Sequence, residues 1–129
     1  AFSLRGKDLF KHIETPTIND IDLLKIGRHF RLDESVKLIV GRNKDENEMI
    51  KALMLPNDIL LEAKEYVGPT ALVRGNDADK HIKFSAKVTL RYSDAPKNET
   101  CVIIVHKNKC ATEISVTHAK EISYTKFRI

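Results

Sequence analysis

The sequence contains no tryptophan, and aromatic residues make up only 6 % of its 129 residues. Because 42 % of the residues are nevertheless apolar, the hydrophobic core must be built mainly from aliphatic side chains. No apolar run approaches the roughly 18 residues of a membrane-spanning helix, so the sequence predicts no contact with a membrane. Length and apolar content together predict one compact domain that spans residues 1–129.

Cysteine is also scarce, and the residue patterns of common catalytic and metal sites are missing. Cys101 and Cys110 flank a predicted turn, but a hairpin centred on Asn108 does not place them opposite each other, so we expect free thiols. The five histidines lack metal-ligand spacing, which predicts no metal site. We find no glycine-rich phosphate-binding motif and no nucleophile signature, and we therefore assign no catalytic residue and no cofactor.

The chain begins with Ala1, and its first residues, AFSLRGKDLFKHIE, lack the apolar core of a signal peptide. We therefore expect a piece excised from a longer protein, or a processed one, and a cytoplasmic location. Lysine and arginine number 22 against 18 aspartates and glutamates, which gives a net charge of +4. This mildly basic balance permits a nucleic-acid partner without requiring one, so the arrangement of the cations must decide.

The most informative stretch, residues 27–47, reads GRHFRLDESVKLIVGRNKDEN. Its apolar run at 36–40 is short and β-branched, which predicts a buried central strand that ends at a glycine. Asn43 then has the position of a helix cap, and Glu46 follows three residues later, at the capping-box spacing. The free N–H groups of such a helix start, with Arg42 beside them, favour a phosphate. The alternative is an ordinary cap next to a solvated arginine.

Hydrophobic periodicity along the rest of the chain predicts an α+β domain with a mixed sheet and a C-terminal β-meander. The expected helices are short ones at 2–14 and after Asn19 or Asp20, and longer ones near 44–53 and 77–92. The expected strands lie at 29–32, 36–40, 59–63, 71–75, 101–106, 110–117 and 122–129, so that 101–129 is all strand.

The predicted helix at 77–92 has one basic side. At about 100° per residue, Lys80, Lys83, Lys87 and Arg91 fall within an arc of roughly 80°, with no acid between them. An acid-free row of cations is suited to a phosphate backbone. A lysine-rich solvated face is an equally open alternative.

Four segments occur in the order that is typical of a known family. They read IGRHFRL at 26–32, VGRNKDENEMI at 40–50, GPTALVRG at 68–75 and RYSDA at 91–95, within a core of about residues 21–106. Together they resemble the NFACT-R RNA-binding domain, and more narrowly the version at the C-terminus of PP-loop ATP-pyrophosphatase proteins related to tRNA 2-thiouridylases. The resemblance implies an α+β fold and the binding of tRNA or another structured RNA.

The same resemblance implies that this domain is an accessory part of a tRNA-modifying transferase, with the ATP-pyrophosphatase domain of the same parent chain as a partner. The sequence departs from the better-known form of the family at Gly68-Pro69-Thr70, where that form has Gly-Ser-His after the proline. Roles of that serine and histidine are therefore not carried over. The PP-loop itself is absent from this sequence.

Residue chemistry and family resemblance predict the same RNA-binding residues. Arginine suits a phosphate because it forms forked hydrogen bonds with it, and lysine supplies a point charge. His29 and Phe30 are also placed to stack on a base, although Phe30 is better explained as core. One alternative is a protein-interaction or dimerisation domain that docks onto an ATP-pyrophosphatase, and another is a contribution to the parent's active site. The predicted RNA-binding residues are Arg28, His29, Arg31, Arg42, Asn43, Arg74, Lys80, Lys83, Lys87 and Arg91.

Overall fold

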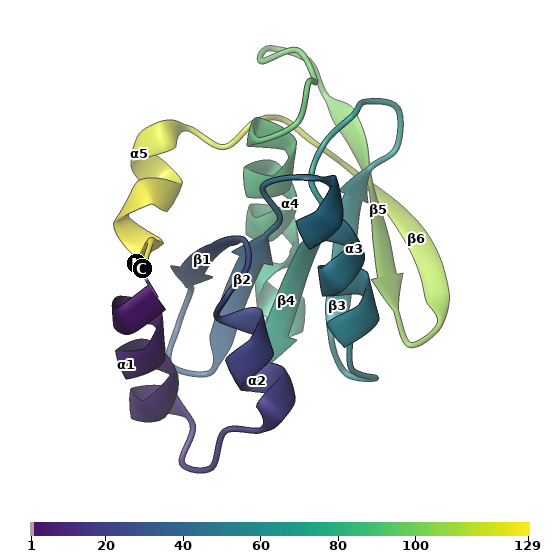
Figure 1. The fold of residues 1–129 in the computed structure, drawn as a ribbon. Coiled ribbons are helices and arrows are strands. Elements are labelled where there is room, and N and C mark those ends of the chain that lie inside the picture. The colour runs from purple at the N-terminus through teal and green to yellow at the C-terminus, as the bar shows by residue number, and fades with distance from the viewer. Residues whose placement is uncertain (1) are drawn as a thin grey trace.

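The computed structural model describes residues 2–129, apart from the side chains of Phe2, Glu121 and Ile122. It contains a six-stranded sheet in the order β1-β2-β4-β3-β5-β6, with helices on both faces (Figure 1). The strands are β1 (Arg28–Arg31), β2 (Val36–Val40), β3 (Ile59–Ala63), β4 (Ala71–Gly75), β5 (Cys101–Lys107) and β6 (Cys110–Val116). The helices are α1 (Phe2–His12), α2 (Ile18–Leu23), α3 (Lys44–Leu53), η1 (Ala78–His81), α4 (Ile82–Arg91), α5 (Glu121–Tyr124) and η2 (Thr125–Phe127).

The α+β class is confirmed, and so is the helix predicted at 44–53. The sheet, predicted as mixed, is antiparallel in every strand pairing. Short turns join β1 to β2 and β5 to β6, and a tight connection of this kind can only join antiparallel strands. The strand predicted at 36–40 is β2, which lies inside the sheet and is buried at all five positions. Both faces of this strand are covered, which explains why four of its five residues are apolar.

Two clusters of apolar side chains fill the space on either side of the sheet. On one face, Phe30, Leu38 and Val73 lie side by side on neighbouring strands and pack under α4, which contributes Leu90. On the other face, a smaller cluster joins the sheet to α2 and α3 and consists of Leu23, Ile26, Ile39, Ile50, Leu60 and Leu72. Consecutive residues of β2 therefore point into different layers, as strand geometry requires.

Two helix starts differ from the prediction. The helix expected over 77–92 begins as a 3₁₀ turn, η1, and becomes α-helical only at Ile82. The cap of α2 is Thr17 rather than Asn19 or Asp20, because the Thr17 side chain accepts the backbone N–H of Asp20 at 3.2 Å. Asp20 in turn accepts the backbone N–H of Thr17 at 2.9 Å, which completes a capping box.

The strand predicted at 122–129 is wrong, because this segment forms α5 and η2 instead. A helical turn places Tyr124 and Phe127, three residues apart, on the same side, whereas a strand would separate them. Tyr124 stacks edge-on against Phe30 at 6.1 Å between ring centroids, and Phe127 does the same against Phe84 of α4 at 5.6 Å. Burial of these rings therefore outweighs the local alternation that predicts a strand.

Cys101 and Cys110 are both free thiols, the first buried and the second exposed. They are not paired across the β5–β6 hairpin, where Cys101 faces Val116 and Cys110 faces Lys107. Within residues 2–129, none of the helices has the length and hydrophobicity needed to cross a bilayer.

Candidate nucleic-acid interface

Three of the segments that resemble the NFACT-R domain meet at one corner of the fold, where α3 begins. The backbone N–H of Gly41 donates to the carbonyl of Thr70 at 3.0 Å, and the N–H of Thr70 donates to the Asn47 side chain at 3.0 Å. Gly68 lies so close to the end of α4 that a Cβ there would come within 2.6 Å of the Cβ of Ser93. Backbone contacts between distant segments therefore account for these sequence patterns.

The start of α3 is closed by the protein's own carboxylate. Asn43 caps the helix by accepting the Glu46 N–H at 2.9 Å, so the capping part of the prediction is confirmed. The Glu46 carboxylate accepts the Arg42 backbone N–H at 3.0 Å and the Arg42 guanidinium at 2.9 and 2.7 Å. These bonds, led by the guanidinium, outweigh burial and lower the pKa of Glu46 to about 2. The position expected to bind a phosphate is thus occupied, and the ordinary-cap alternative describes it better.

Three of the predicted RNA-binding residues have structural partners inside the protein: His29 is buried, and Arg31 and Arg74 are half-buried. His29 has no exposed surface, and its Nε2–H donates to the Ile26 carbonyl at 2.8 Å. Burial in this apolar site lowers the pKa of His29 to about 3, so the ring is neutral. Arg31 forms a forked ion pair with Asp8 of α1, with N–O distances of 2.6 and 3.2 Å.

Arg74 has even more internal partners. Its guanidinium binds Asp58 at 2.9 and 2.7 Å, Asp20 at 3.0 Å and the Asn19 side chain at 2.7 Å. Burial alone would lower the pKa of Arg74, but the bonds and charges of Asp58 and Asp20 outweigh it and raise the pKa. Arg31 and Arg74 are removed from the proposed RNA contacts because carboxylates bind their guanidinium groups, and His29 is removed because its ring is fully buried.

Arg28 is also half-buried, but it has no ion pair among the described residues, and its guanidinium lies over the ring of Tyr92 at 4.5 Å from the ring centroid. This cation–π contact fixes the arginine without neutralising its charge. Arg28 and Tyr92 line a pocket of about 450 Å³ together with Arg42, Asn43, Lys44 and the Gly68-Pro69 loop. The structure therefore brings Arg28 and Arg42 together, although β1 and the start of α3 are separated by a whole strand.

The basic side predicted for residues 77–92 is present on α4. Lys83 is exposed, whereas Lys87 and Arg91 are half-buried. Among the described residues, no carboxylate forms an ion pair with any of these three cations. Lys80 belongs to η1 instead and lies 3.8 Å from Asp77, so it is a weaker member of the set.

The sequence interpretation missed two further cations at the C-terminal end of α4. Lys97 and Lys120 line a pocket of about 450 Å³ with Arg91 and His118, and none of the residues that line it is acidic. The chain reaches this position because the Ala119 N–H donates to the Lys87 carbonyl at 3.1 Å. No local pattern marks these lysines, since they are brought together only when the C-terminal segment crosses α4.

In the part of the chain that the structure describes, no group of three or more histidine, cysteine, aspartate or glutamate side chains is placed to hold a metal ion. What the geometry defines is an α+β domain with accessible basic side chains along α4 and at its C-terminal end.

Comparison with protein families identifies the class of domain. The chain belongs to the family described as the NFACT protein RNA binding domain, whose model matches residues 27–128. A similar fold occurs in the C-terminal part of the fibronectin/fibrinogen-binding protein from Streptococcus suis, with a TM-score of 0.67 and 13 % identity. The match covers 95 % of this chain but 65 % of that one, so this chain spans less than two thirds of the solved structure. A comparison with curated proteins gives no match.

Proposed function

We propose that this domain binds RNA through the α4 basic surface, which consists of Lys83, Lys87, Arg91, Lys97 and Lys120. The observation that carries this proposal is the lack of acidic partners at these residues. Lys83, Lys87 and Arg91 form no ion pair among the described residues, and the pocket of Arg91, Lys97 and Lys120 has no acidic lining. An array of unpaired cations beside one helix suits the phosphates of a nucleic-acid backbone.

Arg28 and Arg42 extend this surface around the end of α4. Arg91 and Tyr92 are consecutive, so the pocket that Arg28 and Tyr92 line begins where the α4 basic surface ends. Arg42 shares its charge with Glu46, yet its side chain is 44 % exposed and has N–H groups left for a phosphate. We expect Arg28 and Arg42 to contribute less to affinity than the unpaired cations of α4.

The RNA that we propose is a structured one such as tRNA, and the support for this choice is the sequence resemblance. The same resemblance supports a parent protein related to tRNA 2-thiouridylases, in which this domain would hold the substrate for a PP-loop ATP-pyrophosphatase domain in the cytoplasm. Membership of the family of NFACT protein RNA binding domains supports an RNA partner but not this particular parent.

The proposal is tested by charge reversal at two sites with the same geometry. Lys83→Glu with Lys87→Glu reverses two charges that are four residues apart on α4, inside the proposed surface. Lys7→Glu with Lys11→Glu makes the same change four residues apart on α1, where both lysines are exposed. The parent and both double variants are titrated against tRNA by fluorescence anisotropy at two salt concentrations, with circular dichroism as the folding control.

We expect the α4 variant to bind at least about tenfold more weakly, and its affinity to depend less steeply on salt, because phosphate contacts are lost. The α1 variant has the same net charge as the α4 variant, but it should bind tRNA nearly as well as the unsubstituted domain. Equal weakening by both variants would mean that overall charge, and not this surface, attracts RNA. If the unsubstituted domain does not bind tRNA even at low salt, the proposed function is contradicted.

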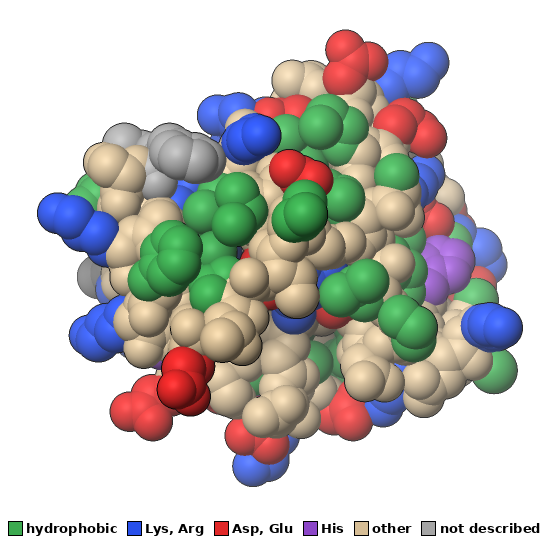
Figure 2. All heavy atoms as spheres, turned by 60° about the horizontal axis from the view of Figure 1, so that its bottom comes forward, with side chains coloured by type: hydrophobic (Ala, Val, Ile, Leu, Met, Phe, Trp, Pro, Cys, Tyr) green, Lys and Arg blue, Asp and Glu red, His purple; other side chains and the backbone are tan. Residues whose placement is uncertain are grey.

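A second candidate function, docking onto a protein partner, is favoured by apolar side chains that are exposed on α1 and α2. Phe10 is 63 % exposed and Ile18 is 78 % exposed, and Leu4 and Ile21 are exposed apolar residues of the same two helices. Figure 2 shows hydrophobic side chains gathered on this face. The proposed partner is the ATP-pyrophosphatase domain of the parent chain.

Docking is tested by calorimetry. The separately expressed ATP-pyrophosphatase domain is titrated with the unsubstituted form of this domain and with its Phe10→Ser variant. An apolar interface should be weakened by the substitution and scarcely affected by salt, the opposite of the pattern expected for RNA. Binding that is unchanged by Phe10→Ser would remove this face as the docking site.

A further inference from the structure

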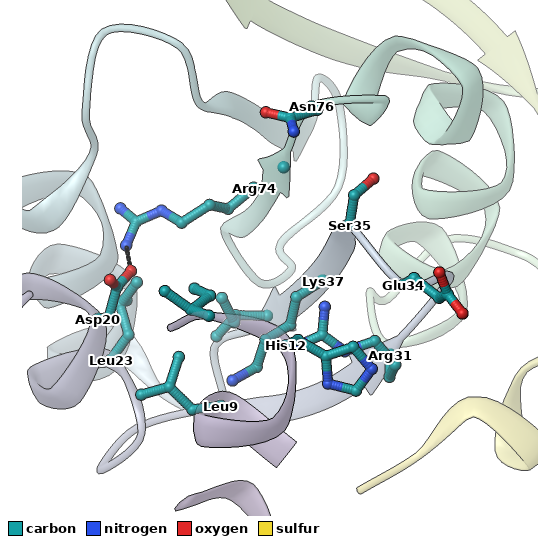
Figure 3. A pocket seen from close by; sticks show the side chains of 13 residues that line it. Leu9, His12, Asp20, Leu23, Arg31, Glu34, Ser35, Lys37, Arg74 and Asn76 are labelled. Atoms are coloured by element: carbon teal, nitrogen blue, oxygen red, sulfur yellow. Dashed lines mark hydrogen bonds and ion pairs between the residues drawn. The ribbon is translucent and has the colours of Figure 1, made fainter. Parts of the chain in front are cut away.

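A third pocket lies on the other face of the sheet, away from the α4 basic surface. It has a volume of about 250 Å³ and is enclosed by α1, α2 and strands β1, β2 and β4 (Figure 3). Leu9 of α1, Ile13 directly after it, Leu23 of α2 and Ile39 of β2 form its apolar wall. This size and lining suit a small molecule with a short hydrocarbon body.

Most of the charged groups around this pocket are already paired, except Lys37 and Glu34, which is an exposed carboxylate with no ion pair among the described residues. Arg31 binds Asp8 at 2.6 Å, and Arg74 binds Asp20 at 3.0 Å and Asp58 at 2.7 Å. These carboxylates are therefore occupied by guanidinium groups. They are poorly placed to neutralise a further cation.

Lys37 is that further cation. It lies on β2 and lines the pocket, and Figure 3 shows its side chain extending toward α1. Only 7 % of its surface is exposed, yet it makes no hydrogen bond and no ion pair with any residue that the structure describes. Burial lowers the pKa of Lys37 to about 8, against the opposing charge of Asp8, so the amine is still mostly protonated at neutral pH.

We propose that this pocket binds a small aliphatic carboxylic acid, with the carboxylate on the Lys37 ammonium and the hydrocarbon chain against Leu9, Leu23 and Ile39. Most of the Lys37 side chain is withdrawn from water and its ammonium has no protein partner among the described residues, so a ligand carboxylate would supply a charged hydrogen-bond partner. Ser35 and Asn76 lie at the same pocket and offer further polar groups. The proposal does not depend on RNA binding, because it uses the opposite face of the sheet.

The test is a methyl NMR titration of the whole domain with hexanoate and, as a matched neutral probe, 1-hexanol. We expect hexanoate to shift the methyl signals of Leu9, Leu23 and Ile39. The shifts should saturate by about 10 mM hexanoate, a concentration that is well above an expected Kd of about 1 mM. Hexanol should bind at least about tenfold more weakly, because it lacks the charge that Lys37 recognises. If hexanol binds as tightly as hexanoate, or if neither moves these signals, the proposal is wrong.

Two lysine variants locate the charge. Lys37→Met keeps the length of the side chain and removes its ammonium, so hexanoate should lose its advantage over hexanol. Lys7→Met removes an exposed lysine of α1 and should leave the titration unchanged. If folded Lys37→Met still binds hexanoate better than hexanol, Lys37 is not the group that recognises the carboxylate. If this variant does not fold, the comparison of hexanoate with hexanol on the unsubstituted domain tests the proposal.

Discussion

Arg31 and Arg74, beneath α1 and α2, are fixed by carboxylates, whereas Lys83, Lys87 and Arg91 on α4 have no such partners among the described residues. All five were assigned the same role from the sequence. The acids that pair with Arg31 and Arg74 lie 23 and 16 residues earlier in the chain, at Asp8 and Asp58. Whether a cation is structural or available therefore depends on which distant acid the fold places beside it.

The largest expected effect is at Arg74. Arg74→Met leaves the buried carboxylate of Asp58 and the half-buried carboxylate of Asp20 without their shared partner, and we expect a loss of about 3–5 kcal/mol in the free energy of unfolding. Urea denaturation measures this loss. Lys83→Met on α4 is the control and should change stability by less than about 0.5 kcal/mol. Similar effects of the two substitutions would remove the distinction between the regions.

A smaller effect is expected from His29, the neutral member of the buried group. Its folded pKa of about 3 is lower than the ordinary value of 6.5, so below pH 6.5 the unfolded chain binds a proton that the folded chain does not. Stability should therefore fall as pH decreases, by about 2–3 kcal/mol between pH 6.5 and roughly 4.5. His29→Gln keeps a donor for the Ile26 carbonyl and should flatten this dependence in urea titrations. An equally steep dependence in that variant would assign the effect to other groups.

Lys37 is buried and has no carboxylate bound to it, so burial lowers its pKa and its pH dependence has the same sign as that of His29, but at higher pH. Its folded pKa of about 8 lies below the ordinary 10.5, so between these values the unfolded chain binds more protons and stability rises with pH. We expect the free energy of unfolding of the unsubstituted domain to rise by on the order of 2 kcal/mol across this range, and this rise should be absent from Lys37→Met. Thermal unfolding at several pH values in this window measures it. A parallel rise in both proteins would mean that Lys37 does not titrate there.

The smallest expected effect is at Arg42, which is both paired and half-exposed. Arg42→Gln should cost about 0.5–1 kcal/mol, because Glu46 still accepts the backbone N–H of residue 42. We expect tRNA affinity in the anisotropy titration to fall only two- to threefold, less than for the Lys83 and Lys87 double variant. A larger loss than on α4 would move the centre of the proposed RNA surface to the start of α3.

Much of the secondary structure was predictable because its signals are local. Apolar runs at 36–40 and 59–63 match β2 and β3, and Asn43 with Glu46 marks the start of α3. The segment 122–129 was not predictable, because its alternation is weaker than the burial of Tyr124 and Phe127 against rings that come from other segments.

The candidate site shows the same division. The acid-free row of Lys83, Lys87 and Arg91 was visible in the sequence, since helix periodicity alone places these residues on one side. Lys97 and Lys120 joined it only through the path of the C-terminal segment across α4.

The sequence by itself determined the α+β class, the helix at 44–53, the main strands and the basic side of α4, because periodicity and capping act over a few residues. Only the tertiary structure decided which cations are neutralised. An ion pair such as Arg74 with Asp58 forms between side chains that different segments bring together, and burial then makes that pairing essential. The same long-range packing leaves Lys37 enclosed without a partner, a state that no local pattern around it reveals.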